Sequence, residues 1–591
     1  MTPDRDRDLV DYLLIGVVSA GVVLALASLF GAGMSTSVAG IRVSARTLFR
    51  PLVLAVSAAL IALWRSKRRA QQFTELWATT RRHATAVAVS IAIVVFAVAM
   101  RMSLFEARAA DQWGYISQAA LWARGDLVTP MPLAATAPWP DATWTVTPLG
   151  YRPGLRPATI VPTYPPGLPL IMAGFIKVFG SFGAFMVVPL LGGLAIVATF
   201  FLGRRIGGAA CGLLAAMFLS TSPIFLYQLR EPMSDVPVTA WWLVATLLIA
   251  APTAASALGA GLAASAAIAT RPNLVPLAAV LGVFVLGYSS ASFRTRLRNA
   301  FCFAAGIVPG CVGLALLNRS LYGSPFESGY GSTAELFKIE YLTSNLSSYP
   351  RWLIETETPL ILLAFVAPWC IRTSLSWLFL ALSATLFASY AFYLPFDNWT
   401  YLRFLLPAIP LLLILSSVVI LQLSQRLPSR ASRWVAAAAC LAVMAWRWDS
   451  AGMQPPPPNE RRYAVVGEFV RDALPQNAIL LSMQHSGSLR YYSGRLTLRW
   501  DLLPPEWLEP GLTFLRANGY RPFLLLEESE QPQFSERFAA HTKLGALDWQ
   551  PVATYSGEIR TDIFDPGDHD RSGPPRATWT IGTVPPASKV R

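Results

Sequence analysis

The sequence predicts a polytopic α-helical membrane protein with about 13 transmembrane helices and a small C-terminal α/β domain. Composition is the first reason. Hydrophobic residues make up 54% of the 591 residues and charged residues only 14%, whereas a soluble domain carries roughly 25% charged residues. The second reason is that apolar runs close to the roughly 20 residues that cross a bilayer recur along the chain, and a long polar segment follows the last of them.

The apolar runs are distributed over most of the chain. They cover residues 10–33, 48–64, 84–104, 183–203, 207–229, 236–251, 254–270, 273–290, 299–317, 356–371, 373–395, 404–424 and 433–447. A further apolar stretch at 167–179 is interrupted by Pro169 and Lys177. It is too short for an upright span, for which about 17 residues is the practical minimum. We expect it to form a helix that lies on, or dips into, the outer leaflet.

Basic residues predict the orientation of the chain. The net charge of +14 is scattered among short loops between apolar runs, which is typical of membrane orientation signals and does not favour nucleic-acid binding. The densest positive cluster runs from Arg65 to Arg69 and continues at Arg81 and Arg82, so this segment is expected in the cytoplasm. The loop 105–182 and the segment after the last span then lie outside it. The sequence thus predicts a multi-pass protein of the plasma or inner membrane.

Four regions follow from this pattern. Residues 1–82 are predicted to contain two transmembrane helices and a cytoplasmic basic loop, and residues 83–450 a membrane module with a large outer loop at 105–182. A run of prolines then leads into an extracytoplasmic α/β domain at 459–566, and the composition of 567–591 indicates a flexible tail. Within the α/β domain, periodicity predicts a helix at 460–473 and buried strands at 478–483 and 522–526.

Asp111 is the first candidate functional residue. It follows the span 84–104 and opens the stretch Ala-Asp-Gln-Trp-Gly-Tyr. An ionisable group held against a bilayer is costly to place there without a role, so it is a functional candidate by default. Asp111 and Tyr115 share one helical stripe, and a surface helix would present them together. The alternative is that Asp111 only caps this helix.

Further candidates stand at helix ends on the same predicted outer face. Arginine suits a phosphate ligand because it binds it bidentately and stays charged. Each candidate also has a purely structural interpretation. Asp235 would cap a helix, Glu231 would pair with Arg230, and Arg271 and Arg403 would anchor helices at the membrane interface. The turn Tyr-Pro-Pro-Gly would then only shape the backbone. These candidates are Tyr164, Arg230, Glu231, Asp235, Arg271 and Arg403.

Other patterns limit the chemistry. No nucleotide-binding glycine motif, HExxH or GxSxG is present, so no soluble nucleotide cofactor is indicated. His485 is expected in a solvated loop rather than acting as a base. All the cysteines lie within apolar runs, which indicates neither a disulfide framework nor a zinc site; they are Cys211, Cys302, Cys311, Cys370 and Cys440.

Several stretches together resemble the GT-C superfamily of integral-membrane glycosyltransferases, especially the branch with the protein O-mannosyltransferases and the lipid A aminoarabinose transferase. The resemblance covers roughly 84–450. It rests on Asp-Gln-Trp-Gly-Tyr from residue 111, Tyr-Pro-Pro-Gly-Leu-Pro-Leu from 164, Phe-Phe-Leu-Gly-Arg-Arg-Ile-Gly-Gly from 200 with the acidic loop 230–235 after it, and Tyr-Leu-Arg-Phe-Leu-Leu-Pro from 401.

The resemblance implies inverting transfer of a sugar from a polyprenyl-phosphate donor to a lipid, polysaccharide or protein acceptor on the non-cytoplasmic face. A phosphate leaving group is already stable as an anion, so the site needs a base for the incoming hydroxyl and cations for the phosphate. Asp111 is the expected base, Asp235 orients the acceptor or the neighbourhood of Asp111, and Arg271 and Arg403 hold the phosphate. The resemblance does not decide whether a divalent metal binds, because Gln112 stands where family members often have a second acid.

Two other functions compete with sugar transfer. A lipid-linked saccharide transporter or flippase would carry ionisable residues near mid-bilayer, whereas here the acids stand at the ends of the apolar runs. A non-catalytic membrane assembly protein would use its C-terminal domain to bind a partner and would not need Asp111. The expected partners are the donor, an acceptor and membrane lipids.

Overall fold

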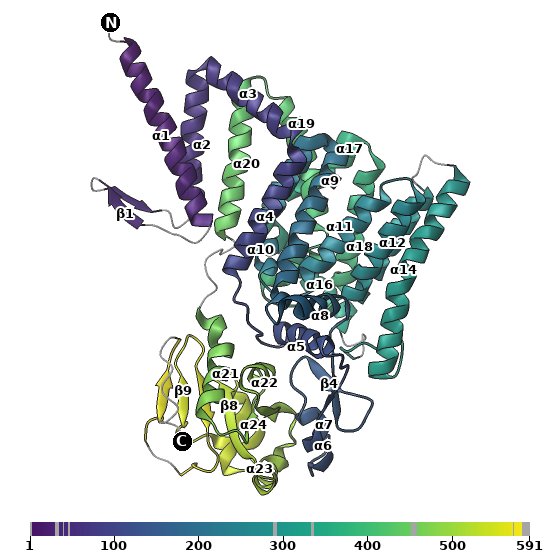
Figure 1. Ribbon diagram of the computed structural model, residues 1–591, viewed down its shortest axis with the longest axis vertical. Helices are drawn as coiled ribbons and strands as arrows, with labels where there is room; N and C mark the ends of the chain where they lie inside the picture. The colour runs from purple at the N-terminus through teal and green to yellow at the C-terminus, as the bar shows by residue number, and fades with distance from the viewer. Residues whose placement is uncertain are drawn as a thin grey trace. The chain divides into compact units, whose positions relative to one another are not determined.

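A computed structural model describes residues 3–29, 35–38, 41–44, 48–287, 292–331, 336–450, 458–570 and 573–581 (Figure 1). The chain divides into two compact units. The first, here called the membrane unit, consists of Met1–Ser103, Val188–Cys311 and Thr333–Pro455. The second, here called the sheet unit, consists of Leu104–Val187, Val312–Ser332 and Pro456–Arg591.

The membrane unit is built almost entirely of helices. A short antiparallel hairpin, β1 (Ser35–Val38) and β2 (Ile41–Ser44), follows the first of them. The helices are α1 (Pro3–Leu29), α2 (Phe49–Arg65), α3 (Lys67–Arg82), α4 (Ala84–Met102), most of α9 (Gly183–Ser220), α10 (Pro223–Leu229), α11 (Asp235–Ile249), α12 (Ala254–Thr270), α13 (Val275–Gly287), most of α14 (Phe293–Tyr322), α16 (Leu342–Glu357), α17 (Ala367–Ile371), α18 (Ser374–Ala391), α19 (Ile409–Gln425) and α20 (Arg430–Ser450).

Breaks in the backbone shorten several of the predicted spans. Four helices among the described residues (α4, α9, α14 and α18) are long and apolar enough to cross a membrane, and the number rises to seven if each bent pair of helices counts as one span. Within α9, Gly208 has φ +80° and separates two helical halves. Short 3₁₀ segments, η3 (Pro359–Val366) and η4 (Trp399–Leu405), precede α17 and α19. The prediction of a largely helical, multi-span membrane protein is confirmed.

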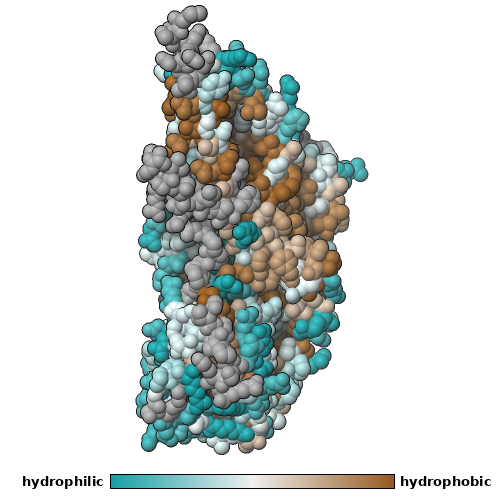
Figure 2. Space-filling view, turned by 60° about the vertical axis from the view of Figure 1, so that its left-hand side comes forward, coloured by the Kyte–Doolittle hydropathy of each residue, from teal (hydrophilic) through white to brown (hydrophobic). Residues whose placement is uncertain are grey.

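The outer surface of these helices is apolar. Figure 2 shows brown, hydrophobic residues gathered over the helices and teal, hydrophilic residues over the C-terminal domain. Phe301, Val283 and Trp369 are 73%, 64% and 67% exposed. An apolar surface of this extent is stable only when other apolar groups cover it. Lipid chains provide that cover for helices, because a helix satisfies its own backbone hydrogen bonds.

The sheet unit combines the large loop with the C-terminal domain. A three-stranded sheet has the order β3-β5-β4. The loop elements are α5 (Asp111–Ala123), β3 (Thr129–Pro130), α6 (Pro132–Thr136), α7 (Ala142–Thr145), β4 (Tyr151–Pro153), β5 (Thr159–Pro162) and α8 (Gly167–Phe179). Residues 105–182 therefore belong to the same compact unit as the C-terminal domain.

The C-terminal domain contains a mixed sheet of six strands in the order β11-β9-β10-β8-β6-β7. Strand β6 runs parallel to both β7 and β8. The predicted helix and strands are present as α21, β6 and β8. The elements are α21 (Arg462–Ala473), β6 (Ala478–Leu481), α22 (Ser486–Ser493), β7 (Leu496–Leu498), α23 (Leu508–Ala517), β8 (Arg521–Glu527), α24 (Gln531–Phe538), β9 (Ala553–Tyr555), β10 (Thr561–Phe564) and β11 (Ala577–Trp579).

The last strand lies within the segment 567–591, which its composition indicated to be flexible. Strand β11 pairs in parallel with β9. Trp579 is 2% exposed and stacks on Phe469 of α21, with ring centroids 3.8 Å apart. Burial of one large aromatic side chain in the core outweighs the low hydrophobicity of the residues around it. The expectation of flexibility is therefore wrong for 577–579.

Candidate functional site

Asp111 opens α5 and faces a buried tyrosine. The residue before it, Ala110, is the N-cap, and no side-chain capping bond is formed there. The hydroxyl of Tyr164 instead donates a hydrogen bond to Asp111 Oδ1 at 2.9 Å. Burial, followed by the nearby Asp111 carboxylate, raises the pKa of Tyr164 well above its usual value, so the phenol keeps its proton and acts as a donor.

Tyr164 is held in place from several sides. Its backbone oxygen accepts a hydrogen bond from Gln118 Nε2 at 3.0 Å. The rings of Tyr115 and Tyr164 lie with centroids 4.4 Å apart, and Tyr115 is 4% exposed. A Cβ on Gly114 would lie 2.0 Å from the Tyr164 ring, so α5 approaches this ring as closely as only glycine allows. Tyr115 thus supports Tyr164, and both predicted residues belong to the Asp111 cluster.

The C-terminal domain fixes the start of α5. Arg108 forms an ion pair with Glu460 at 2.7 Å, and the backbone N–H of Ala107 donates to the Tyr492 hydroxyl at 2.8 Å. The ring of Trp113 covers Gly487 of α22 so tightly that a Cβ there would meet the indole at 2.2 Å. Residues far apart in the sequence therefore position Asp111.

Asp235 lies in a second cluster, in the membrane unit. It is fully buried in the first turn of α11, and Arg271 Nη2 donates to its Oδ1 at 2.6 Å. Arg271 Nε also donates to Ser234 Oγ at 3.1 Å, and its Nη1 to the Tyr390 hydroxyl at 3.2 Å. The other carboxylate oxygen, Asp235 Oδ2, has no hydrogen-bond partner among the residues that the structure describes.

Two arginines meet on one aromatic ring in this second cluster. The guanidinium carbons of Arg271 and Arg403 lie 5.4 and 5.3 Å from the centroid of the Phe404 ring. Arg403 also lies over Tyr401 at 5.0 Å. Two cations that lie on one ring, beside the Asp235 carboxylate, create a place where an anion is electrostatically favoured. We call this group the arginine pair cluster.

The remaining predicted residues lie just before α11. Glu231 is 8% exposed, and the guanidinium of Arg230 lies 5.8 Å from the Tyr227 ring. Met233, in the same turn, accepts a hydrogen bond from Arg403 Nη1 at 3.4 Å through its sulfur atom. This turn therefore contacts the arginine pair cluster.

Within the described parts of the chain, no group of three or more His, Cys, Asp or Glu side chains is arranged to hold a metal ion. The five cysteines are free.

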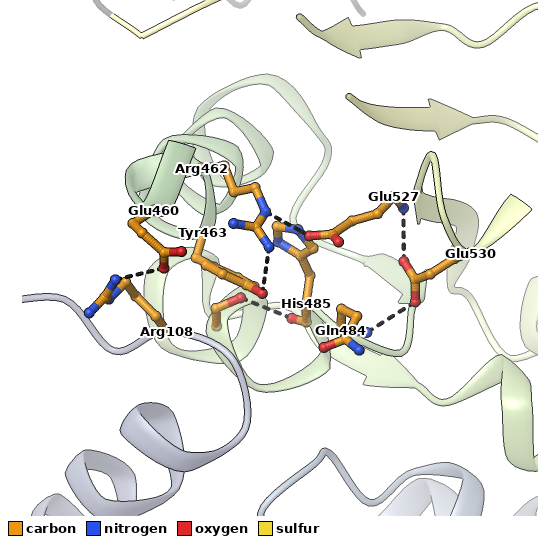
Figure 3. Close-up of polar contacts among 9 residues, drawn as sticks. Arg108, Glu460, Arg462, Tyr463, Gln484, His485, Glu527 and Glu530 are labelled. Atoms are coloured by element: carbon orange, nitrogen blue, oxygen red, sulfur yellow. Dashed lines mark hydrogen bonds and ion pairs between the residues drawn. The ribbon is translucent and has the colours of Figure 1, made fainter. Parts of the chain in front are cut away.

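A buried polar network lies in the C-terminal domain (Figure 3). His485 is fully buried, and its Nε2 lies 3.0 Å from Glu527 Oε1. The expectation of a solvated loop is therefore wrong, because His485 is buried between the ring of Tyr463, 4.6 Å away, and the carboxylate of Glu527. Arg462 Nε donates to the same carboxylate at 2.8 Å. Although burial alone would raise the pKa of Glu527, His485 and Arg462 lower it to about 2.

Glu530 holds two strand ends together in this network. It accepts hydrogen bonds from the backbone N–H groups of Gln484 at 3.1 Å and Glu527 at 2.8 Å. Burial raises the pKa of Glu530 to about 7 despite these bonds. Sequence reasoning missed this network, although the available signal was a run of polar residues directly after two buried parallel strands.

Comparisons with known proteins agree with the predicted resemblance. Residues 163–314 match the family model of dolichyl-phosphate-mannose-protein mannosyltransferase. The structure resembles ArnT from Cupriavidus metallidurans, solved with undecaprenyl phosphate bound, with a TM-score of 0.51 at 12% identity over 81% of this chain and 97% of that chain. It also resembles the oligosaccharyltransferase of Archaeoglobus fulgidus in its apo form, with a TM-score of 0.53 at 10% identity over 81% and 74%.

At such low identity, the two solved structures establish the fold alone. No curated protein sequence matches the chain. The family match and the shared fold together confirm the resemblance drawn from the sequence. The chain is thus similar in fold to GT-C membrane glycosyltransferases and, over residues 163–314, similar in sequence to the protein mannosyltransferase family.

Proposed function

We propose that the chain is an inverting glycosyltransferase that moves a sugar from a polyprenyl-phosphate donor to an acceptor hydroxyl on the non-cytoplasmic face of the membrane. Dolichyl phosphate in the family description and undecaprenyl phosphate in the ArnT structure are both polyprenyl phosphates. The full membrane part would comprise about 13 spans, with broken and short helices counted. The acceptor is a lipid, a polysaccharide or a protein.

The observation that carries this proposal is the arginine pair cluster. Arg271 and Arg403 share the Phe404 ring beside one buried carboxylate. A departing phosphate gains negative charge as it leaves, so preorganised cations stabilise the transition state more than the bound donor. Asp235 acts here as a positioning residue, because its Oδ1 holds Arg271. Its buried Oδ2 is the atom that would orient an acceptor hydroxyl.

Asp111 is the proposed general base. Its carboxylate takes the proton of the acceptor hydroxyl, and the freed oxygen forms a bond to the anomeric carbon. The bond between that carbon and the phosphate oxygen breaks, and the polyprenyl phosphate leaves with the electron pair. Tyr164 keeps the carboxylate in one orientation through its 2.9 Å hydrogen bond. The topology drawn from the basic residues puts Asp111 and Asp235 on the same face.

The other predicted residues have supporting parts in this proposal. Arg230 and Glu231 would contact the donor from the turn before α11, and Tyr115 would keep Tyr164 in position. The proposal assigns no metal ion to the site, and no step of the reaction depends on one.

Activity of the Asp111→Asn variant tests the proposed base. The full-length protein is supplied with synthetic polyprenyl-phosphate sugars and with membranes as a source of acceptor, and released polyprenyl phosphate is measured. Loss of a general base lowers the rate by roughly 10²- to 10⁴-fold. The matched control is Asp126→Asn in the same unit. Its carboxylate is 61% exposed and makes a long, exposed ion pair with Arg124 at 3.8 Å, so its loss should not change the activity. Equal turnover by wild type and Asp111→Asn would refute the base and favour a non-catalytic role.

A further inference from the structure

A cavity lies in the membrane unit, between α3, the break in α9, α17 and α19. Its volume is about 700 Å³, which is within the range of small-molecule sites. Arg81 and Arg82 of α3 line one side, and Ile206, Val418 and Leu421 line the apolar remainder. None of the residues that the proposed sugar transfer uses lines this cavity.

The break in α9 makes room for the cavity. Gly208 adopts φ +80°, and a Cβ there would meet no atom within 4 Å. On either side of the break the two helical halves lie in contact, since a Cβ on Gly203 would be 2.9 Å from the Cα of Gly212. The backbone thus reverses with two adjacent glycines, Gly207 and Gly208, at the cavity wall. A Cβ on Gly207 would meet Cys211 at 2.8 Å and Val418 at 3.1 Å, so the open space at the cavity wall lies beside Gly208.

The charge of the cavity is positive. Arg81 and Arg82 are exposed, and neither side chain has a hydrogen bond or an ion pair within the described residues. No acidic side chain is among the lining residues. Gln425, at the end of α19, adds a neutral polar group beside the arginines. Two uncompensated guanidinium groups next to apolar walls are complementary to a ligand with an anionic head and an apolar body.

Helix α3 has the character of a helix that lies on a membrane surface. Phe73, Leu76 and Trp77 stand at helical spacing and are 43%, 63% and 40% exposed. Basic residues flank this apolar stripe at both ends of the helix. An amphipathic helix with basic ends binds the boundary between lipid headgroups and acyl chains. In Figure 1, α3 runs across the end of the helices of the membrane unit near α17 and α19.

We propose that this cavity binds an anionic phospholipid of the cytoplasmic leaflet, with its phosphate on Arg81 and Arg82 and the start of its acyl chains against the wall of Val418 and Leu421. Basic pockets between transmembrane helices on the cytoplasmic side are suited to such headgroups. The side follows from the dense basic cluster of α3. This site does not depend on the proposed sugar transfer.

Binding to the full-length protein in detergent tests the site. Native mass spectrometry and thermal stability are measured with phosphatidylglycerol, with phosphatidylcholine of the same acyl chains, and with inorganic phosphate. Each arginine near a membrane surface contributes roughly fivefold to the binding of an anionic lipid. We therefore expect Arg81→Gln/Arg82→Gln to lower phosphatidylglycerol retention by roughly 25-fold.

Two further variants make the test specific. Arg68→Gln/Arg426→Gln removes two exposed arginines outside the cavity and should retain phosphatidylglycerol as the wild type does. Ala78→Trp fills the cavity while leaving both arginines, and it should lose the lipid. Equal retention of phosphatidylcholine, equal stabilisation by inorganic phosphate, or an unchanged Arg81→Gln/Arg82→Gln variant would each overturn the proposal.

Discussion

Tyr164 is the residue whose role changes most between sequence and structure. The sequence indicates either a substrate contact or part of a rigid turn, whereas the structure shows a buried hydroxyl bonded to Asp111. A catalytic carboxylate with two free rotatable bonds samples many orientations, and a fixed donor selects one of them. The hydroxyl therefore matters for rate more than for substrate affinity.

We predict that Tyr164→Phe lowers kcat of sugar transfer by about 10- to 100-fold with little change in KM, because a hydrogen bond to a charged group is worth about 1.5 to 3 kcal/mol. Tyr322→Phe is the control, since its hydroxyl donates to the backbone oxygen of Pro162 in the same unit. Steady-state kinetics on both variants separates the two parameters. A Tyr164→Phe enzyme with normal kcat would show that Asp111 needs no such orientation.

At the scale of elements, α5 and α22 act as one assembly. Trp113 Nε1 donates to the backbone oxygen of Leu149 at 2.9 Å, and the backbone N–H of Leu149 donates to Ser486 Oγ at 3.2 Å. Arg490 of α22 bonds the backbone oxygen of Val146. The large loop is thereby tied to the C-terminal domain along its length, which gives that domain a direct part in holding Asp111.

We expect Gly487→Ala to displace α5, because the new Cβ would overlap the indole of Trp113 at 2.2 Å. A shift of about 1 Å at a catalytic group costs on the order of 10²-fold in rate. Transfer activity and hydrogen exchange of the α5 amides report the two effects. Gly174→Ala in α8 is the control, since a Cβ there meets nothing within 4 Å. Full activity of Gly487→Ala would mean that the contact with α22 is dispensable.

The buried polar network of His485, Glu527 and Glu530 makes the stability of the C-terminal domain depend on pH. Burial raises the pKa of Glu530 from 4.5 to about 7, so the folded state binds its proton more tightly than the unfolded state. This contribution to stability is complete below pH 4.5 and is lost as the pH rises to 7. Glu106, whose pKa burial also raises to about 7, acts in the same direction.

Between acidic and neutral pH, the free energy of unfolding of the Glu530→Gln variant should therefore fall by about 3 kcal/mol less than that of the wild type. Pulse proteolysis of the full-length protein at pH 5 and pH 8 measures the stability of the domain. The change between the two pH values is compared with that of wild type, which removes the contribution of Glu106. Glu528→Gln, at an exposed position, should behave as wild type does. An identical pH dependence in Glu530→Gln would contradict the assignment.

On the scale of the whole molecule, the sidedness of the membrane decides which reaction is feasible. Reporter fusions after residues 75, 150 and 460 should place the first in the cytoplasm and the other two outside, because the dense basic cluster at 65–82 stays inside. A reporter active only outside the cytoplasm and one active only inside it are used in parallel. A cytoplasmic signal at 150 would place Asp111 on the wrong face for the proposed transfer.

The sequence by itself determined the helical, multi-span membrane class, the helix at 167–179 and the C-terminal helix and strands. These depend on hydropathy and local periodicity, which are properties of neighbouring residues. It also indicated Asp111, Asp235, Arg271 and Arg403 as candidates, since charges are rare beside membrane spans.

Only the tertiary structure decided how these candidates are paired. The bonds of Tyr164 to Asp111 and of Arg271 to Asp235 join residues 53 and 36 positions apart. The place of His485 in a buried network and the strand at 577–579 likewise depend on distant partners. No local pattern encodes such contacts, because each is stabilised by packing between elements that meet only once the chain has folded.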